Sequence, residues 1–389
     1  YALRGDARTT GLWVSSLDLK EEKMLCAADS GAYYSSPGYL LYRTGDRLVA
    51  RPFDGRKQRL TGEAVVMVED VWWDGSSTFA TAFAASPTGV LAYQTGGLAL
   101  TSLILYDRSG REVGTLGPPG AYFEPTLSPD ASRLAVSRTD GTGTRIWMIG
   151  LERGGFTRVS FQSAVQATPL WTPDGRKILF ANYPGGEVSI HDVEGVEKDG
   201  TLFKPSGFSP LDDLSRDGRW LFREVVDWPT FRFSVSMRDM RSGSEQPVLK
   251  EPFNQLGARI SPDGRWLAYE SEESGVREVF VRSFPALGDR RQISTGGGSQ
   301  ARWRGDGKEL FYASPDRKIM AVDVATQPAF KASIPRPLFQ SRILPTIEAR
   351  NHYDVFADGQ RFVVNSRRPE DRALPITVVT GGIPAPGKP

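Results

Sequence analysis

The sequence has few of the residues that build metal centres and covalent cross-links. Its 389 residues include one cysteine, Cys26, and two histidines, His191 and His352. A single cysteine excludes an internal disulfide and a cysteine-rich metal site, and two histidines exclude a three-histidine zinc site. Calcium loops with alternating aspartates are also missing. We therefore expect no metal ion and no cofactor, and we expect Cys26 to be a small packing residue.

Long hydrophobic runs and an excess of positive charge are absent too. No stretch reaches the ~18 apolar residues of a membrane span; the longest candidate, 98–106, has the length of a strand. The chain holds 48 basic and 46 acidic residues, a net charge of +2, and its basic residues form only short clusters such as Arg290-Arg291. A nucleic-acid-binding protein typically carries a basic stripe or arm. We expect no nucleic-acid partner and no transmembrane segment in this stretch of chain.

Enzyme signatures are missing as well. The sequence lacks the Gly-rich loop, His-Arg-Asp loop and Asp-Phe-Gly motif of protein kinases, and it lacks the Gly-x-Ser-x-Gly elbow of α/β-hydrolases. We therefore expect no catalytic residue. The chain opens with Tyr1, in a segment that reads as the middle of a strand, and we expect that further sequence precedes it.

The sequence does contain much glycine and proline, 41 and 27 residues, which indicates many tight turns between short strands. A Ser-Pro-Asp-Gly-Arg-like turn recurs six times, with an apolar residue three positions before the aspartate. The six aspartates are Asp130, Asp174, Asp217, Asp263, Asp306 and Asp358. They lie 43 to 52 residues apart, the spacing of β-propeller blades. Two worn copies precede them, at 36–38 and 86–89.

Each copy predicts a β-hairpin. Glycine supplies a positive φ and aspartate bonds its own backbone in such a turn, and an apolar strand follows at once, as at 266–269. A third and a fourth strand follow in several copies, as at 145–149 and 156–159. No stretch of ten residues shows a clean helical period. We predict an all-β fold, a propeller of four-stranded antiparallel blades, in which the six aspartates are structural turn residues.

The number of blades follows less directly from the sequence. We predict a single propeller region over 1–389, in which 1–30 form a partial first blade, 31–366 hold seven repeats and the start of the last, and 367–389 supply a closing strand and a tail. Eight blades are favoured if the two ends share one blade. Seven blades, or six blades plus blades of a neighbouring ring, are the alternatives.

The repeat resembles that of TolB-type, WD-repeat-like propellers. The residues that carry this resemblance are the Ser-Pro-Asp-Gly-Arg hairpin at 261–265 and the Leu-Ala-Tyr strand that follows it. It covers nearly the whole chain, and 257–322 is similar to the propeller regions that follow kinase or winged-helix domains in bacterial sensor proteins. The resemblance implies a fold more than a function, and it favours an extracytoplasmic or periplasmic location.

One repeated position supplies the candidate ligand site. Four residues before each turn aspartate stand Thr126, Leu170, Asp213, Arg259, Arg302 and Asp354. The strand that carries them is innermost in a propeller, so their side chains should point towards neighbouring blades or the axial channel. Arg259 and Arg302 could bind an anion between Asp213 and Asp354, or the four could form salt bridges between blades. Two residues near the start of such strands, Gln300 and His352, complete the candidates.

These observations favour a non-catalytic scaffold within a larger bacterial protein. Its partner would be a protein, a peptide or a small ligand at the channel mouth. The alternative is the propeller region of an enzyme, a serine/threonine kinase or a prolyl-oligopeptidase-like hydrolase, whose catalytic domain is absent from this chain. Under the ligand hypothesis, Arg302→Ala weakens binding and leaves the melting temperature nearly unchanged.

Overall fold

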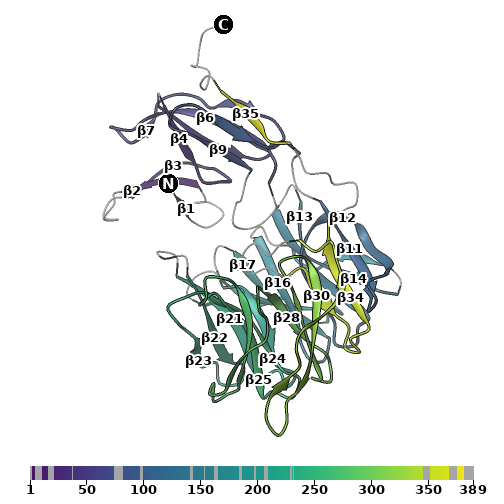
Figure 1. Cartoon of the computed structure of the whole chain (residues 1–389). Helices are drawn as coiled ribbons and strands as arrows, with labels where there is room; N and C mark the ends of the chain where they lie inside the picture. Colours follow the sequence, from purple (N-terminus) through teal and green to yellow (C-terminus); the bar gives the residue numbers. More distant parts are fainter. Residues whose placement is uncertain are drawn as a thin grey trace. The chain divides into compact units, whose positions relative to one another are not determined.

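The computed structural model describes residues 2–4, 11–15, 22–36, 38–73, 82–96, 100–140, 143–152, 154–161, 165–183, 186–196, 199–205, 209–227, 230, 232–344, 351–367 and 375–380. These residues form strands and turns only (Figure 1), which confirms the all-β prediction. No helix in the described ranges is long and apolar enough to cross a membrane. The strands separate into two compact units: unit 1, Tyr1–Leu100 with Thr139–Gly143 and Pro369–Pro389, and unit 2, Thr101–Arg138 with Thr144–Arg368.

Unit 2 is a closed ring of six blades. The innermost strands of these blades are β12 (Glu112–Leu127), β16 (Val165–Trp171), β20 (Leu211–Leu214), β24 (Gln255–Ile260), β28 (Ser299–Trp303) and β33 (Tyr353–Val355). Each of these strands contacts the next, and β33 contacts β12. The innermost strands therefore surround a common axis.

Four blades are consecutive along the chain. Three of them are simple antiparallel meanders, formed by β16, β17 (Lys177–Tyr183), β18 (Val188–Asp192) and β19 (Gly200–Phe203); by β20, β21 (Trp220–Asp227), β22 (Arg232–Asp239) and β23 (Glu245–Leu249); and by β24, β25 (Trp266–Ser271), β26 (Glu278–Ser283) and β27 (Arg290–Gln292). The fourth consists of β28, β29 (Glu309–Ala313) and β30 (Lys318–Ala325), with β31 (Lys331–Ala332) and β32 (Arg336–Gln340) both paired to β30.

The remaining two blades close the ring. They share the long strand β12 in one sheet, whose order is β15 (Phe156–Arg158), β14 (Gly143–Gly150), β13 (Arg133–Asp140), β12, β11 (Thr101–Asp107), β34 (Arg361–Ser366) and β33. The closing blade thus takes β33 and β34 from late in the chain and β11 from early in unit 2. Ile104 faces Val364 in this pairing. Pairing between strands distant in sequence therefore closes the ring.

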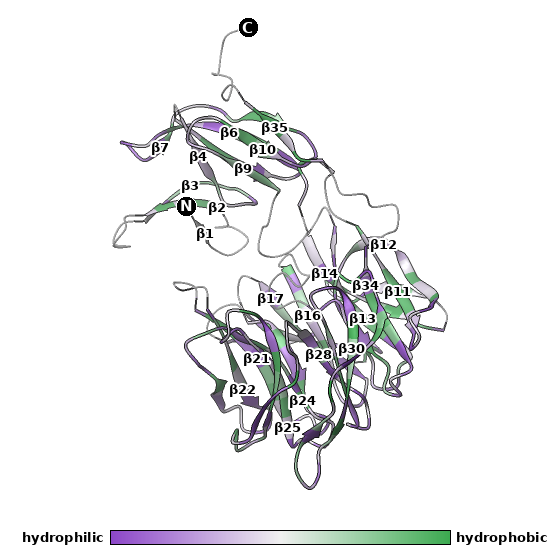
Figure 2. Cartoon of the chain, viewed as in Figure 1, coloured by the Kyte–Doolittle hydropathy of each residue, from purple (hydrophilic) through white to green (hydrophobic). Residues whose placement is uncertain are grey.

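The core of unit 2 lies between neighbouring blades. All six residues of β25 are buried, because the sheet is covered on both faces. Between the β28 and β33 blades, the rings of Phe311 and Phe362 pack edge to face with centroids 5.3 Å apart. The strands carry most of the hydrophobic residues, whereas the turns are largely hydrophilic (Figure 2). Burial of these apolar faces favours the radial arrangement of sheets.

Unit 1 is built from three smaller sheets. They are β1 (Ala2–Arg4), β2 (Gly11–Ser15) and β3 (Glu22–Cys26); β4 (Tyr33–Ser35), β5 (Tyr39–Thr44), β6 (Arg47–Asp54), β7 (Arg59–Leu60) and β8 (Val65–Val68); and β9 (Phe83–Ala85), β10 (Leu91–Tyr93) and β35 (Thr377–Val379). The expected closing strand is β35. It pairs with β10, Leu91 facing Val379, and its sheet does not include β1 to β3, the strands of the expected partial first blade.

The favoured count of eight blades over 1–389 is not confirmed. The ring of unit 2 has six, and they coincide with the six well-formed turns at Asp130 to Asp358. The worn copies at 36–38 and 86–89 fall in unit 1, with Pro37 outside the described residues, as are Tyr1 and residues 16–17 of the expected first blade. The ring closes at six because β34 pairs with β11. The alternative of six blades plus blades of a neighbouring ring stays a prediction.

Candidate functional site

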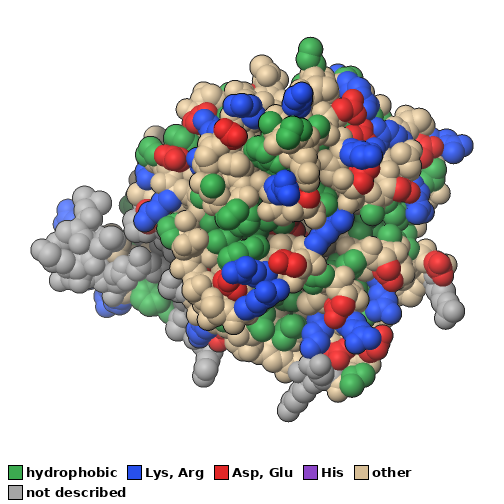
Figure 3. Space-filling view, turned by 90° about the horizontal axis from the view of Figure 1, so that it is seen from below, with side chains coloured by type: hydrophobic (Ala, Val, Ile, Leu, Met, Phe, Trp, Pro, Cys, Tyr) green, Lys and Arg blue, Asp and Glu red, His purple; other side chains and the backbone are tan. Residues whose placement is uncertain are grey.

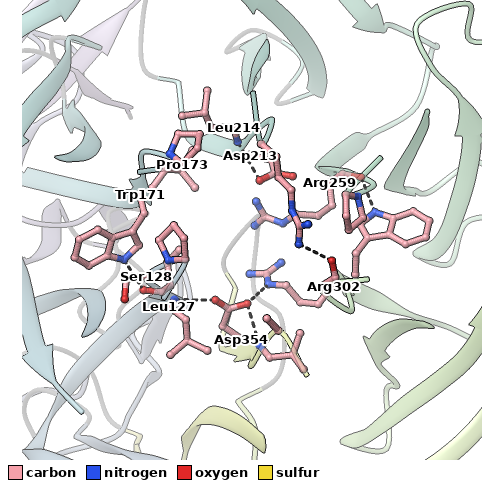
Figure 4. A pocket seen from close by; sticks show the side chains of 18 of the residues that line it. Leu127, Ser128, Trp171, Pro173, Asp213, Leu214, Arg259, Arg302 and Asp354 are labelled. Carbon is pink, nitrogen blue, oxygen red and sulfur yellow. Dashed lines mark hydrogen bonds and ion pairs between the residues drawn. The ribbon is translucent and has the colours of Figure 1, made fainter. Parts of the chain in front are cut away.

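A cavity of about 510 Å³ lies at the end of the ring where the innermost strands finish. We call it the axial cavity. It is lined by all six innermost strands and the turns that follow them: Thr126, Leu127, Ser128, Pro129, Ala131, Leu170, Trp171, Pro173, Asp213, Leu214, Arg216, Arg259, Ile260, Pro262, Arg302, Trp303, Gly305, Asp354, Val355 and Ala357. The position four residues before the turn aspartate lines this cavity in every blade. Figure 4 shows Asp213, Arg259, Arg302 and Asp354 directed towards its centre.

Asp354 joins three blades at the cavity wall. Its Oδ1 accepts hydrogen bonds from Nε of Arg302, at 3.1 Å, and from the backbone N–H of Val355, at 3.0 Å. Its Oδ2 accepts one from the backbone N–H of Leu127, at 2.8 Å. Arg302 also donates from Nη1 to the carbonyl oxygen of Ala301, at 3.0 Å. Arg302 and Asp354 thus form the salt bridge between blades that was one of the two hypotheses.

Asp213 uses its oxygens in the same way on another pair of blades. Its Oδ2 accepts a hydrogen bond from the backbone N–H of Ile260, at 2.9 Å, and its Oδ1 accepts one from Leu214, at 3.0 Å. Burial raises the pKa of Asp213, and the positive charge of Arg259 opposes that rise. Both oxygens accept hydrogen bonds from backbone N–H groups, and these bonds hold the carboxylate in place.

Arg259 differs from Arg302 in its hydrogen bonding and ion pairing. Its guanidinium makes no hydrogen bond or ion pair to any residue that the structure describes, although only 8% of Arg259 is exposed. Burial lowers the pKa of Arg302, and the nearby positive charge of Arg259 lowers it further. Two arginines of neighbouring blades therefore face the same cavity and repel one another.

A third arginine reaches this side of the cavity. Arg216 donates from Nη2 to the carbonyl oxygen of Gly305, at 2.6 Å, so its side chain connects the turn after β20 with the turn after β28. Sequence reasoning did not select Arg216. The sequence does distinguish this position, the one before the turn aspartate, because three other turns have proline there (Pro129, Pro173 and Pro262). Arginine departs from that pattern.

Apolar side chains form the rest of the cavity. The indole N–H of Trp171 donates to the carbonyl oxygen of Thr126, at 2.9 Å, and that of Trp303 donates to the carbonyl oxygen of Arg259, at 3.0 Å. These hydrogen bonds fix each ring across the gap to the preceding blade. The cavity therefore combines rigid apolar walls with a charged side.

The turn aspartates lie outside the lining of the cavity. Asp130 is typical: its Oδ1 accepts from the hydroxyl of Ser128, at 2.6 Å, and from the N–H of Ser132, at 3.0 Å. Asp174, Asp217, Asp263, Asp306 and Asp358 likewise accept the N–H two residues on. These hydrogen bonds hold the pKa of Asp130 at about 2. The carboxylates cap turns.

His352 and Gln300 are placed apart from the axial cavity, towards the other end of the innermost strands. Both are buried, with exposed fractions of 4% and 1%. The backbone N–H of His352 donates to the side-chain oxygen of Gln300, and the N–H of Gln300 donates to Oε1 of Glu270, at 2.6 Å. Gln300 also lines a second cavity, of about 400 Å³, between the β24 and β28 blades. The structure thus brings together four of the six candidates.

Sequence analysis did not identify three buried carboxylates on the strands of unit 2. Asp212, Glu224 and Glu270 are at most 3% exposed, and each accepts a backbone N–H of the following blade, from Ala258, Gly257 and Gln300 respectively. Burial raises the pKa of Asp212 to about 7 and that of Glu224 well above its usual range. No cluster of His, Cys, Asp or Glu suited to a metal ion occurs among the described residues.

Comparison with known proteins gives partial sequence matches. No family model matches the chain. It is 27% identical over 149 residues to the uncharacterized peptidase YuxL of Bacillus subtilis, across 38% of this chain and 21% of that protein. It is 26% identical over 126 residues to the Tol-Pal system protein TolB of Anaeromyxobacter dehalogenans, across 32% of this chain and 26% of that protein. The chain thus matches about a quarter or less of the length of these curated relatives.

Structural comparison covers more of the chain. A solved structure described as a TolB of Agrobacterium tumefaciens superposes with a TM-score of 0.54 and 16% identity, over 69% of this chain and 99% of that chain. Identity at this level reports on the fold alone. It agrees with the resemblance carried by the Ser-Pro-Asp-Gly-Arg turns. The chain is therefore shown to have the fold of a TolB-type β-propeller.

Proposed function

We propose that this chain is a non-catalytic interaction module, part of a larger bacterial protein, and that unit 2 binds a protein or peptide partner in the axial cavity. One observation carries the proposal: each of the six blades contributes the same repeat position to a single cavity. Loops and strand ends held by a rigid scaffold are the usual place for binding residues. A volume of about 510 Å³ lies within the range of ligand pockets.

The chemistry of the cavity lining supports binding rather than catalysis. It includes no histidine or cysteine. Its two hydroxyl groups are engaged, since Ser128 donates to Asp130 at 2.6 Å and Thr126 donates to the carbonyl oxygen of Pro169 at 3.1 Å. A nucleophile needs an adjacent base that can take its proton. The lining residues offer no such pair.

A protein partner fits the surface and the relatives better than a nucleic acid does. On the face shown in Figure 3, Lys and Arg side chains are interspersed with Asp and Glu, whereas a nucleic-acid site concentrates positive charge. One relative belongs by its name to the Tol-Pal system, which supports a protein assembly. We extend the proposal to an extracytoplasmic or periplasmic location, which the resemblance to TolB-type propellers favours.

Site-specific photo-crosslinking in the source bacterium tests the proposal. A benzophenone amino acid replaces Ala357, an exposed residue at the cavity rim, or Leu202, which is 38% exposed on the outer strand β19. We expect an adduct from position 357 that is absent from position 202 and is lost when Thr126→Trp fills the cavity. Equal adducts at both positions, or an adduct that survives Thr126→Trp in a folded protein, would overturn the proposal.

The second candidate is the propeller region of a peptidase. The match to the YuxL peptidase supports it, although that match covers 21% of the relative. The full-length natural protein distinguishes the two candidates. Labelling of a segment outside this chain by a fluorophosphonate probe, with cleavage of peptide substrates, would favour the peptidase. A protein that neither reacts with the probe nor cleaves peptides would favour the interaction module.

A further inference from the structure

We propose that the axial cavity recognises a carboxylate on a peptide partner and that Arg259 is the residue that binds it. The inference rests on the proposed function and goes further, because it names the chemical group that the cavity selects. It follows from how the charged side chains of the cavity are partnered.

The first step concerns Arg259 itself. Arginine carries five N–H donors in a planar fork, and none of those on Arg259 is used by the described residues. The side chain lines the cavity, and the residue is 8% exposed. No nitrogen of its guanidinium is among the buried side-chain atoms of the described residues that lack a hydrogen-bond partner, so these donors open into the cavity and are available to a ligand. An oxygen pair from a ligand would supply the missing acceptors in bidentate geometry.

The second step concerns the acidic residues beside it. Asp213 and Asp354 cannot turn towards Arg259 without losing their bonds to other blades. Asp213 accepts the N–H groups of Ile260 and Leu214, and Asp354 accepts those of Leu127 and Val355 together with Arg302. The two carboxylates are thus structural, and the free donor capacity of the cavity remains at Arg259.

The third step is the charge of the lining. Three guanidinium groups, those of Arg216, Arg259 and Arg302, face two carboxylates, which leaves an excess of one positive charge when both acids are ionised. A ligand with a single negative charge balances this excess, whereas a phosphate dianion overcompensates it. Charge complementarity therefore favours a carboxylate.

The fourth step is the shape and polarity of the walls. Trp171 and Trp303 are held by their indole hydrogen bonds, and Pro129, Pro173 and Pro262 line the same cavity. An apolar chain next to the charged group would bury its surface against these rings. A short apolar peptide that carries one carboxylate combines both requirements, either at its C-terminus or on an acidic side chain.

Calorimetric titration of the whole chain with four probes tests the inference. The probes are N-acetyl-Leu-Leu with a free carboxylate, the same peptide as its C-terminal amide, N-acetyl-Leu-Glu amide, and inorganic phosphate. We expect a carboxylate peptide to bind at least about 10-fold more tightly than the neutral amide, as for a charge-assisted bidentate contact. Preference for N-acetyl-Leu-Leu assigns the group to a chain end, and preference for N-acetyl-Leu-Glu amide assigns it to a side chain.

Variants then test whether Arg259 is the residue that binds the carboxylate. Arg259→Gln should weaken the carboxylate peptide about 10-fold or more, and Arg259→Lys, which keeps the charge but loses the fork, should weaken it less. The matched control is Arg265→Gln, an exposed arginine of the same blade outside the cavity lining. It should bind as the parent does. Melting curves check that each variant is folded, and Arg259→Lys retains a test if Arg259→Gln unfolds.

Several results would overturn the inference. They are equal binding of the amide and the carboxylates, tighter binding of phosphate than of either carboxylate peptide, no binding of either carboxylate peptide at about 10 mM, or unchanged affinity in both folded Arg259 variants. The proposed function fails separately, through the crosslink at position 357. A cavity-specific adduct without carboxylate preference would leave the interaction module standing and remove this inference.

Discussion

Nε of Arg302 lies 3.1 Å from Oδ1 of Asp354 across the interface between the β28 blade and the closing blade of unit 2. Arg302 belongs to β28 and Asp354 to β33, and their side chains are only 9% and 15% exposed. Asp354 also accepts the backbone N–H of Leu127 on β12. One carboxylate therefore connects three blades: its ion pair reaches the β28 blade, and its hydrogen bond to Leu127 reaches β12.

Loss of this pair should destabilise unit 2. Arg302→Ala leaves the largely buried carboxylate of Asp354, 15% exposed, without its cation, and removal of one partner of a buried pair costs about 3 kcal/mol or more. We expect the free energy of unfolding, measured by urea denaturation, to fall by that amount. Arg259→Ala should cost less, because Arg259 has no direct ion pair to lose.

A double-mutant cycle with Asp354→Asn supplies the control for this prediction. The double variant should be less destabilised than the sum of the two single variants, because the second change removes the charge that the first leaves unpaired. Additive effects would show that the pair is not formed in solution. This result would also decide between the two hypotheses for Arg302, which expected either a stability effect or a binding effect.

Truncation of Trp303 tests the packing of the innermost strands. The ring of Trp303 packs against the cluster between the β24 and β28 blades, and its indole N–H donates to the carbonyl oxygen of Arg259 at 3.0 Å. We expect Trp303→Ala to cost about 3–5 kcal/mol of unfolding free energy, as large core truncations do. Trp303→Phe keeps most of the packing and should cost less. A loss below about 1 kcal/mol for Trp303→Ala would mean that the ring does not pack here.

The repeat made much of the fold and part of the site predictable. Six turns with an aspartate and a well-placed apolar residue predicted the hairpin that starts each blade of unit 2, because both features are local to one hairpin. The position four residues before the aspartate gave Arg259 and Asp213, since every copy of a repeat places that position at the same depth in the ring. The predicted count of eight blades also used the two worn copies, which lie in unit 1.

Features that depend on contacts between blades could not be predicted. The buried Asp212 and Glu224 look like ordinary strand residues in the sequence, and their roles arise from the backbone N–H groups of the following blade. His352 and Gln300 sit near the start of innermost strands, yet Gln300 has a φ of 60°. A bulge at that position redirects the side chains around it. The bulge depends on how the two strands pair, so the residues around Gln300 do not predict it.

The raised pKa of Asp212, about 7, predicts that stability falls with rising pH. Burial favours the protonated acid in the folded state, whereas an unfolded aspartate titrates near pH 3.9. The stabilisation is therefore complete below about pH 4 and is lost as the pH rises through about 7. The pKa of the neighbouring Glu224 is also raised, and the charge of Arg259 opposes the shift at Asp212. The melting temperature should be higher at about pH 5 than at about pH 8.

Asp212→Asn is the control for this pH dependence. Its amide oxygen can still accept the N–H of Ala258, but the residue no longer titrates, so the melting temperature should change less between these two pH values. Asp130 does not interfere, because hydrogen bonds hold its pKa at about 2. Identical pH profiles for the parent and Asp212→Asn would show that Asp212 is ionised throughout.

Gly305 tests the contact between the turns that follow β28 and β33. Its N–H donates to the carbonyl oxygen of Ala357 at 2.9 Å, and a Cβ at position 305 would lie 2.6 Å from that same oxygen. Since the clash is with backbone, Gly305→Ala must push the two turns apart, and overpacking of this kind costs about 1–3 kcal/mol. The matched control is Gly155→Ala, where an added Cβ meets no atom within 4 Å. We expect the first variant to lower the melting temperature by several degrees and the second to leave it nearly unchanged. Equal melting temperatures would mean that the β28 and β33 blades do not touch at these turns, and the ring would then be open at the interface where Arg302 meets Asp354.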